Sequence, residues 1–216
     1  MVRDWWSCHP YLMANGEDEE DGPFLASLPP LIRAAACGDL VEVRRLLDAG
    51  HPPDESEDAW SALHAASTRG HASIVVALLD AGSAVDAPAG GVTALWNASG
   101  PSPSAETVRL LLEAGADPNA TDPLMGWSPL DRATQYCKAE IASLLIKAGA
   151  DVNYADEKGW TLLMTAAETG CTSVARLLLA AGANPSAACD GKTAGDIALE
   201  HGHVGFRDLV VGRAGA

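Results

Sequence analysis

The sequence predicts an all-α solenoid in which short pairs of helices stack along one axis. The main observation is an internal repeat, because the tail Leu-Leu-x-Ala-Gly or a close variant ends at Gly50, Gly82, Gly115, Gly149 and Gly182. Successive glycines are separated by 32, 33, 34 and 33 positions. A second short segment, which opens on a Ser or Thr residue, recurs with the same period. A fixed period of this length indicates stacked supersecondary units instead of one closed core.

The first helix of each repeat is expected to begin at a hydroxyl residue that can accept a hydrogen bond from a free amide of the first turn. These residues are Ser61, Thr93, Ser128, Thr161 and Thr193. Pro129 suits the first helical position, where its missing N–H costs nothing. Glycines such as Gly70 and Gly170 are expected to end the first helix in a left-handed turn.

The second helix of each repeat carries apolar residues at positions i, i+3 and i+4, which lie on one face. The stripes are Val43/Leu46/Leu47, Val75/Leu78/Leu79, Val108/Leu111/Leu112, Ile141/Leu144/Leu145 and Val174/Leu177/Leu178. After the closing glycine, stretches such as residues 117–122 are rich in Asp, Asn and Pro and have turn chemistry. A helix pair this short cannot bury its stripe alone, so each unit depends on its neighbours.

Five segments carry a resemblance to a known family. They are Trp60-Ser-Ala-Leu-His-Ala-Ala66, Val92-Thr-Ala-Leu-Trp-Asn-Ala98, Trp127-Ser-Pro-Leu-Asp-Arg-Ala133, Trp160-Thr-Leu-Leu-Met-Thr-Ala166 and Lys192-Thr-Ala-Gly-Asp-Ile-Ala198. This pattern resembles the ankyrin signature Thr-Pro-Leu-His-x-Ala. The likeness continues in Gly-Ala-Asp-Pro-Asn at 115–119 and Gly-Ala-Asp-Val-Asn at 149–153. It implies an ankyrin-repeat solenoid of helix-turn-helix units joined by short β-hairpin loops.

The likeness divides the chain into an acidic, flexible N-terminal arm over residues 1–27 and an ankyrin repeat domain over residues 28–216. The expected units are 28–56, 57–89, 90–121, 122–155, 156–188 and 189–211, followed by a short tail. Both end units depart from the pattern: the first lacks a hydroxyl start and places Arg33 on its outer face, and Gly195 replaces the signature leucine in the last. We therefore expect the last unit to fray first.

Composition narrows the class of partner and the compartment. The chain has 14 Lys and Arg residues against 29 Asp and Glu residues, a formal net charge of −15, which argues against nucleic acid. This charge would speed the encounter with a protein partner that has a basic surface, and the other interpretation is ordinary solvation of the surface. There is no apolar run of about 18 residues, so no contact with a membrane is expected. The first 27 residues lack the apolar core of a secretion signal. A monomer in the cytoplasm is expected, with the nucleus as the alternative.

The five cysteines, Cys8, Cys37, Cys137, Cys171 and Cys189, contain no Cys-x-x-Cys pair and recur at no fixed place in the repeat. The sequence therefore predicts scattered buried thiols in a reducing compartment, with neither a zinc site nor a disulfide framework. Cys8 is the candidate for a reactive thiol because it lies outside the repeats. His201 and His203 lack the third ligand that a zinc site needs.

The sequence contains no complete copy of a phosphate-binding loop or of a nucleophile elbow. Asp190-Gly-Lys-Thr193 ends like a phosphate-binding loop, but Ser186 stands where the first glycine is required. No Gly-x-Ser-x-Gly elbow is present in the sequence. No catalytic residue, cofactor site or metal site is predicted.

Candidate partner-binding residues fall in three groups. Three tryptophans, Trp60, Trp127 and Trp160, precede the Ser or Thr that starts a first helix, and aromatic side chains are good binding anchors. The other interpretation is that they pack sideways on a neighbouring hairpin. In the ankyrin likeness the remaining candidates lie on the hairpin tips and at the concave ends of the first helices. The tip residues are Glu57, Asp58, Glu157 and Lys158, and the concave residues are Arg69, Tyr136 and Glu168.

The third unit departs most from the pattern. It has Trp96-Asn97 where the signature has His-x, and an extra residue in Gly100–Ser104 that is expected to bulge at the surface. Ser102-Pro103 is a candidate for proline-directed phosphorylation, against a plain solvated loop. A second extra residue lengthens the hairpin at 122–126, where Leu124 and Met125 are a candidate apolar contact point.

Together these observations predict a non-enzymatic protein-binding adaptor or regulator that uses hairpin tips and the concave helix face. One alternative is a catalyst or small-molecule-binding protein that uses the concave groove, which shifted pKa values in a pocket would favour. Another is a targeting subunit of a larger complex.

Overall fold

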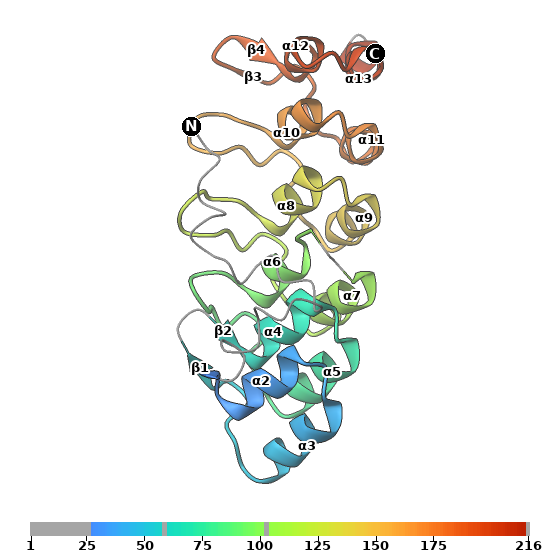
Figure 1. Ribbon diagram of the computed structural model, residues 1–216. Coiled ribbons are helices and arrows are strands. Elements are labelled where there is room, and N and C mark those ends of the chain that lie inside the picture. The colour runs from blue at the N-terminus through green and yellow to red at the C-terminus, as the bar shows by residue number, and fades with distance from the viewer. Residues whose placement is uncertain (1–26, 58–59, 102–103, 215–216) are drawn as a thin grey trace.

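The computed structural model describes residues 27–57, 60–101 and 104–214. Its helices form two parallel rows that run the length of the stack (Figure 1). The inner row is α2 (Pro30–Ala36), α4 (Ala62–Arg69), α6 (Ala94–Ala98), α8 (Pro129–Gln135), α10 (Leu162–Thr169) and α12 (Ala194–Glu200). The outer row is α3 (Leu40–Asp48), α5 (Ala72–Asp80), α7 (Ala105–Glu113), α9 (Ala139–Lys147), α11 (Thr172–Ala180) and α13 (Val204–Ala214).

The loops between units project on the side of the inner helices (Figure 1). Two of them contain short antiparallel hairpins, β1 (Ser56–Glu57) with β2 (Trp60–Ser61) and β3 (Ala188–Cys189) with β4 (Lys192–Thr193). Two others are closed by single antiparallel bridges, Ala89 with Val92 and Ala155 with Thr161. The predicted solenoid of helix pairs with short hairpins is confirmed.

The predicted helix starts follow the capping rule. The hydroxyls of Ser61, Thr93, Ser128 and Thr193 accept hydrogen bonds from the amide three residues ahead, over 3.4, 3.2, 3.2 and 3.4 Å. Thr161 is the N-cap of α10 in the same extended conformation, but among the described residues its hydroxyl has no hydrogen-bond partner. Gly70 and Gly170 end α4 and α10 in left-handed turns with φ of 73° and 70°.

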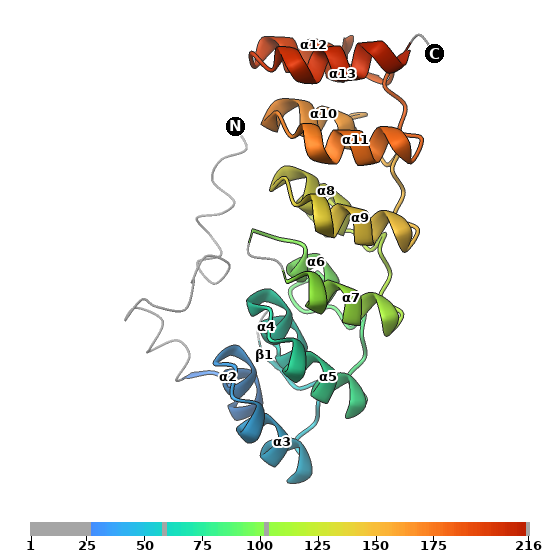
Figure 2. The ribbon, with the colours of Figure 1, turned by 90° about the vertical axis from the view of Figure 1, so that its right-hand side faces the viewer.

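One continuous apolar core runs through the stack. The stripes of the outer helices point inward, so that Val75 and Leu78 of α5, for example, are fully buried together with Leu63 of α4. Each helix contacts its partner in the same unit and the equivalent helices of the adjacent units. Figure 2 shows these layers edge on, each pair resting on the next. Stability is therefore distributed over the junctions, as expected of a solenoid.

A ladder of Asp and Asn side chains joins successive inter-unit loops. The carboxylate of Asp54 accepts from the amide of Ala84, and that of Asp86 accepts from the amide of Asp117. Asn119 and Asn153 make two bonds each, accepting from the next loop's amide at 2.8 Å and donating to the closing glycine's carbonyl at 3.2 Å. We call these four side chains the Asx ladder.

The end units differ from the middle ones as their sequences predict. The first helix, α2, begins after Pro29 with Pro30 in its first turn, and the side chain of Arg33 is exposed. At the other end Gly195 is buried inside α12, where the other repeats place a leucine.

The cysteine prediction is wrong in two respects. Cys137 and Cys171 form a disulfide that joins the turn between α8 and α9 to the start of α11, with their Cα atoms 5.5 Å apart. Cys37 is exposed instead of buried, whereas Cys189 is a buried free thiol as expected. The disulfide went unpredicted because its 34-residue separation acquires meaning only when adjacent units are superposed in register.

Candidate protein-binding surface

The three predicted tryptophans are half-buried. Trp60 and Trp160 pack against the core, and the Trp160 indole N–H donates to the Thr165 hydroxyl at 3.0 Å. The carbonyl of Trp127 accepts from the indole of Trp96 at 2.8 Å. Each therefore leaves only part of its ring accessible to a partner.

The charged and aromatic candidates lie where the ankyrin likeness places them. Arg69 is the last residue of α4, Tyr136 caps α8, and Glu168 is exposed in the last turn of α10. Glu157 and Lys158 are exposed at the tip of the loop closed by the bridge between Ala155 and Thr161. Arg69, Tyr136, Glu157, Lys158 and Glu168 are called the inner face below.

Of the remaining charged candidates, Glu57 and Asp58, only the backbone of Glu57 lies within the part of the chain that the structure describes. The backbone of Glu57 pairs with that of Trp60 in the first hairpin. Asp58, Ser102, Cys8 and residues 1–26 of the predicted arm lie outside the described residues.

The centre of the inner row holds a buried aromatic and cationic cluster. The Arg132 guanidinium lies over the ring of Trp96, with Cζ 3.7 Å from the ring centroid, and 5.9 Å from that of Tyr136. Arg132 is almost fully buried, and burial lowers the pKa of its guanidinium to about 10. Gly100 closes over this guanidinium, since a Cβ there would overlap with Arg132 Nη2. The third-unit insertion therefore begins with a buried residue instead of bulging throughout.

The signature histidine position carries His64, Trp96, Asp131, Met164 and Asp196 in the second to sixth units. His64 Nε2–H donates to the Val92 carbonyl at 2.9 Å, so in the neutral ring Nδ1 accepts from the Ser61 hydroxyl at 2.8 Å. Burial lowers the pKa of His64, which keeps the ring neutral. Trp96 occupies the same position and makes the equivalent inter-unit bond to the Trp127 carbonyl. The indole N–H thus replaces the imidazole in joining one unit to the next.

Asp131 occupies the same signature position in the fourth unit. It closes a capping box with Ser128, whose backbone amide and hydroxyl donate to Asp131 Oδ2 at 2.9 and 2.6 Å. Burial nevertheless raises the pKa of Asp131 to about 6, because desolvation of the carboxylate outweighs these bonds. The polar groups of His64, Trp96 and Asp131 are hydrogen-bonded within the fold, which indicates a structural role for this position of the repeat.

The lengthened hairpin at 122–126 is held rigidly. The buried Asp122 carboxylate accepts from the amides of Leu124, Met125 and Trp127 at 3.0, 2.8 and 2.8 Å. Leu124 is 66% exposed and Met125 37%, so the tip presents two apolar side chains on a fixed backbone. The expected apolar tip is therefore present.

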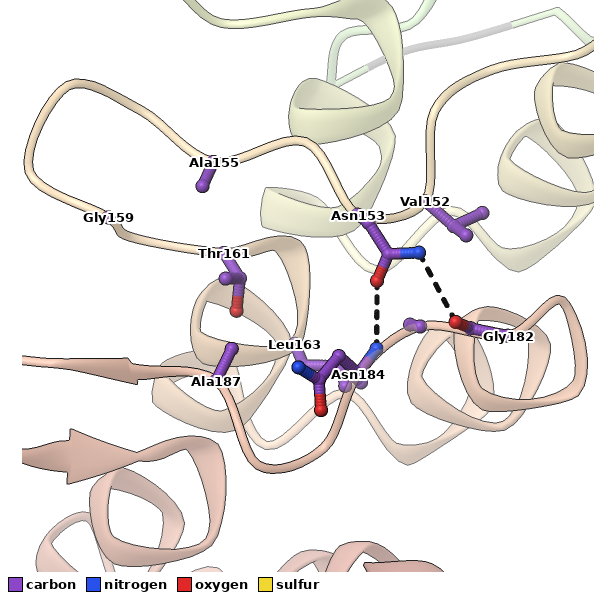
Figure 3. A pocket seen from close by; sticks show the side chains of 10 residues that line it. Val152, Asn153, Ala155, Gly159, Thr161, Leu163, Gly182, Asn184 and Ala187 are labelled. Atoms are coloured by element: carbon purple, nitrogen blue, oxygen red, sulfur yellow. Dashed lines mark hydrogen bonds between the residues drawn. The ribbon is translucent and has the colours of Figure 1, made fainter.

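A hollow of about 380 Å³ lies between the loops that follow α9 and α11. Figure 3 shows Asn153 at its edge, bonded to the Asn184 amide and the Gly182 carbonyl. The walls are formed by Val152, Asn153, Ala155, Gly159, Thr161, Leu163, Gly182, Ala183, Asn184 and Ala187. None of these residues is titratable, so the shifted pKa values that would favour a catalytic pocket lie elsewhere, in the packed inner row.

The described ranges contain no group of three or more His, Cys, Asp or Glu side chains arranged to hold a metal ion. Within the same ranges, the helices are all too short or too polar to cross a bilayer.

Two contacts between adjacent units were missed from the sequence. The stacking of Arg132 on Trp96 joins residues 36 positions apart, and the disulfide joins residues one repeat and one position apart. The only sequence signal for either is the repeat register, which places Cys137 and Cys171 at adjacent turns and marks Trp96 as a departure from the signature.

Comparisons with known proteins agree with this architecture. Glycerophosphocholine phosphodiesterase gde1 of Schizosaccharomyces pombe is 42% identical over 65 residues, and nuclear factor NF-kappa-B p105 subunit of Mus musculus is 38% identical over 135 residues. These matches cover 30% and 59% of this chain, but only 6% and 14% of those proteins. A crystal structure of an ankyrin repeat domain from Acinetobacter baumannii matches with a TM-score of 0.75 and 28% identity, over 85% of this chain and 97% of that domain.

The family model described as ankyrin repeats, in three copies, matches residues 31–122, 92–156 and 130–214. These overlapping matches span the whole stack of helix pairs, and the chain therefore belongs to the ankyrin repeat family.

Proposed function

We propose that this chain is a non-enzymatic binding module, an adaptor or regulator that recognises a protein partner through its inner face, which comprises the concave helix ends and the hairpin tips. The observation that carries the proposal is the contrast between core and surface. The second position of four first helices is a core leucine (Leu63, Leu95, Leu130 and Leu163), whereas the last turns and caps of the inner helices carry residues as different as Arg69, Tyr136 and Glu168. Different exposed chemistry on one repeated backbone suits recognition of one particular partner.

The charge of the chain supports a partner with a basic surface. With a net charge of −15, long-range attraction would speed the encounter with such a surface and disfavour nucleic acid. The half-buried tryptophans would contribute aromatic anchors beside the charged tips. We place the protein in the cytoplasm, with the nucleus as the alternative, and expect it to act as a monomer.

A charge-reversal variant tests the use of the inner face without disturbing the core. The triple variant Glu157→Lys, Lys158→Glu, Glu168→Lys changes exposed residues only. A matched control, Asp80→Lys, Glu140→Lys, Lys147→Glu, makes the same net change on exposed positions of the outer helices. Both variants are checked for an unchanged circular dichroism spectrum.

The measurement is affinity capture from extracts of cells that express the chain, followed by mass spectrometry. We expect a protein that is retained by the wild type and by the control, and lost or strongly depleted with the inner-face variant. A protein lost with the control but kept by the inner-face variant would place recognition on the outer helices. If the wild type retains no protein, the adaptor proposal is contradicted, and screening of metabolites would follow.

A further inference from the structure

The turns between paired helices contact the next unit in a recurring way. A Cβ on Gly38 would lie 2.9 Å from the ring of His71, and one on Gly170 would lie 2.7 Å from the ring of His203. In each case the turn glycine of one unit lies against the residue that precedes the second helix of the next unit. We call this arrangement the turn contact.

Cys137 and Cys171 occupy the turn contact between the fourth and fifth units. Cys137 lies in the turn after α8, at the position that Gly170 occupies after α10. Cys171 is the N-cap of α11, just as His71 is the N-cap of α5. At this junction the contact between glycine and histidine is replaced by a covalent bond between two sulfur atoms.

The backbone conformation at Cys137 favours glycine, so the turn itself does not require a cysteine there. Its φ is 54°, in the left-handed region that the equivalent Gly38, Gly70 and Gly170 adopt at 75°, 73° and 70°. This region disfavours a residue with a Cβ, and glycine would fill it without penalty. The bond to Cys171 accounts for a cysteine there.

Solvent reaches one end of this disulfide. Cys137 is exposed, whereas Cys171 is 3% exposed beneath it. Thiol–disulfide exchange requires access of the attacking thiolate to a sulfur atom, and the exposed Cys137 side offers that access. A fully buried bond would be shielded from reductants, so exposure makes this one responsive to its surroundings.

We propose that Cys137 and Cys171 form a reversible thiol–disulfide site that controls how firmly the last two units dock on the fourth. In the oxidising direction a Cys thiolate attacks glutathione disulfide, releasing one glutathione and leaving a mixed disulfide on the protein. The second cysteine then attacks that mixed disulfide and releases the second glutathione. Two protein thiols are oxidised and one glutathione disulfide is reduced to two thiols. Two glutathione molecules reverse the reaction.

The effect follows from the nearest-neighbour construction of the stack. Helices α10 to α13 attach to the rest of the chain through the contacts of α10 with α8 and of α11 with α9. The disulfide ties these two pairs of helices together across a 34-residue separation, which limits the freedom that the last units gain on opening. We expect reduction to raise the frequency of their opening on the order of 10²- to 10³-fold.

Hydrogen–deuterium exchange of the full chain tests this inference, in buffers containing either glutathione disulfide or reduced glutathione. Peptide mapping before each run records whether Cys137 and Cys171 are bonded. Amides of α10 and α11 should exchange on the order of 10²- to 10³-fold faster in the reducing buffer, while those of α3 to α5 change little. Helices α12 and α13 can also open by fraying of the last unit, which the disulfide does not restrain.

Two variants keep the result interpretable. Cys137→Gly with Cys171→His rebuilds the turn contact seen at two other junctions, so it should fold and exchange at the same rate in both buffers. Cys37→Ser removes the exposed free thiol found within the described residues and should leave the response of the wild type unchanged. The inference is overturned if Cys137 and Cys171 stay unbonded in glutathione disulfide, if bonded and reduced wild type exchange alike, or if the double variant keeps the response.

Discussion

Replacing Asp131 by Asn should stabilise the protein at neutral pH, although it removes a charged capping residue. Asp131 is 8% exposed, and its Oδ2 accepts from the amide and hydroxyl of Ser128. An asparagine carbonyl can accept the same two bonds. It does so without a charge, and so avoids the desolvation cost of burying a carboxylate.

The magnitude follows from the pKa of Asp131, which burial raises from its ordinary value of 3.8 to about 6. Between these values the folded state binds a proton that the unfolded state has released, so the free energy of unfolding falls as pH rises through this window. A shift of about 2 pKa units corresponds to about 3 kcal/mol. The proton on Asp131 therefore stabilises the folded wild type fully below pH 3.8, and this part of the free energy of unfolding is lost above about pH 6.

Urea unfolding of the wild type and of Asp131→Asn, at several pH values from 4 to 7, measures the effect. We expect the stability of the variant relative to the wild type to increase by up to about 3 kcal/mol across this range. Other titrating groups, including His64 with its lowered pKa, are common to both proteins and cancel in the difference.

Asp196→Asn provides the matched control. Asp196 holds the same position in its unit and accepts from the amide and hydroxyl of Thr193 at 2.9 and 2.6 Å, but it is exposed. The hydrogen bonds from Thr193 lower the pKa of Asp196, so this variant should lose stability at neutral pH relative to low pH. A pH-independent difference between Asp131→Asn and the wild type would refute the argument that burial dominates at Asp131.

Three further predictions concern the junctions and the last unit. Gly195→Ala should stabilise the protein by about 0.5–1 kcal/mol and slow amide exchange in α12, because alanine favours a helix interior more than glycine does. The added Cβ would lie 3.5 Å from Val211 Cγ2, which is an ordinary contact, and faster exchange would contradict this prediction. Trp96→Phe should cost about 1–3 kcal/mol in urea unfolding, because the Trp127 carbonyl loses its indole donor; an unchanged midpoint and slope would show that this bond contributes nothing. Asn153→Ala should cost about 1–2 kcal/mol by loss of two hydrogen bonds, and Asn153→Asp, which keeps the acceptor, should cost less; equal losses would show that the bond accepted from the Asn184 amide contributes nothing.

Local rules explain why so much of the fold could be predicted. A hydroxyl before a helix and a glycine after it act within a few residues, so Ser61 and Gly70 determine the ends of α4 regardless of their neighbours. The apolar stripe of α5 likewise requires only a helical period. The placement of Glu168 and Lys158 on the surface then followed from the repeat.

Contacts between units could not be predicted in the same way, because they depend on how one repeat lies on the next. The sequence marked Trp96 as a departure from the signature, but only the structure shows its indole bonding to the neighbouring loop and its ring beneath Arg132. The pairing of Cys137 with Cys171 likewise required the register between two units. For the tryptophans, Trp60 and Trp160 are half-buried against the core, and their use as anchors remains a proposal.

The Asx ladder allows a whole unit to be added or removed without breaking the hydrogen bonds between the remaining units. Each rung joins a side chain of one loop to the backbone of the next, and backbone groups are the same in every unit. Deleting or duplicating one whole unit leaves every remaining rung with an acceptor and a donor in register, whereas cutting within a unit leaves a rung open. The chain can therefore lengthen or shorten in evolution by complete repeats, and the rungs with Asn, which make two bonds, are the better places to add one.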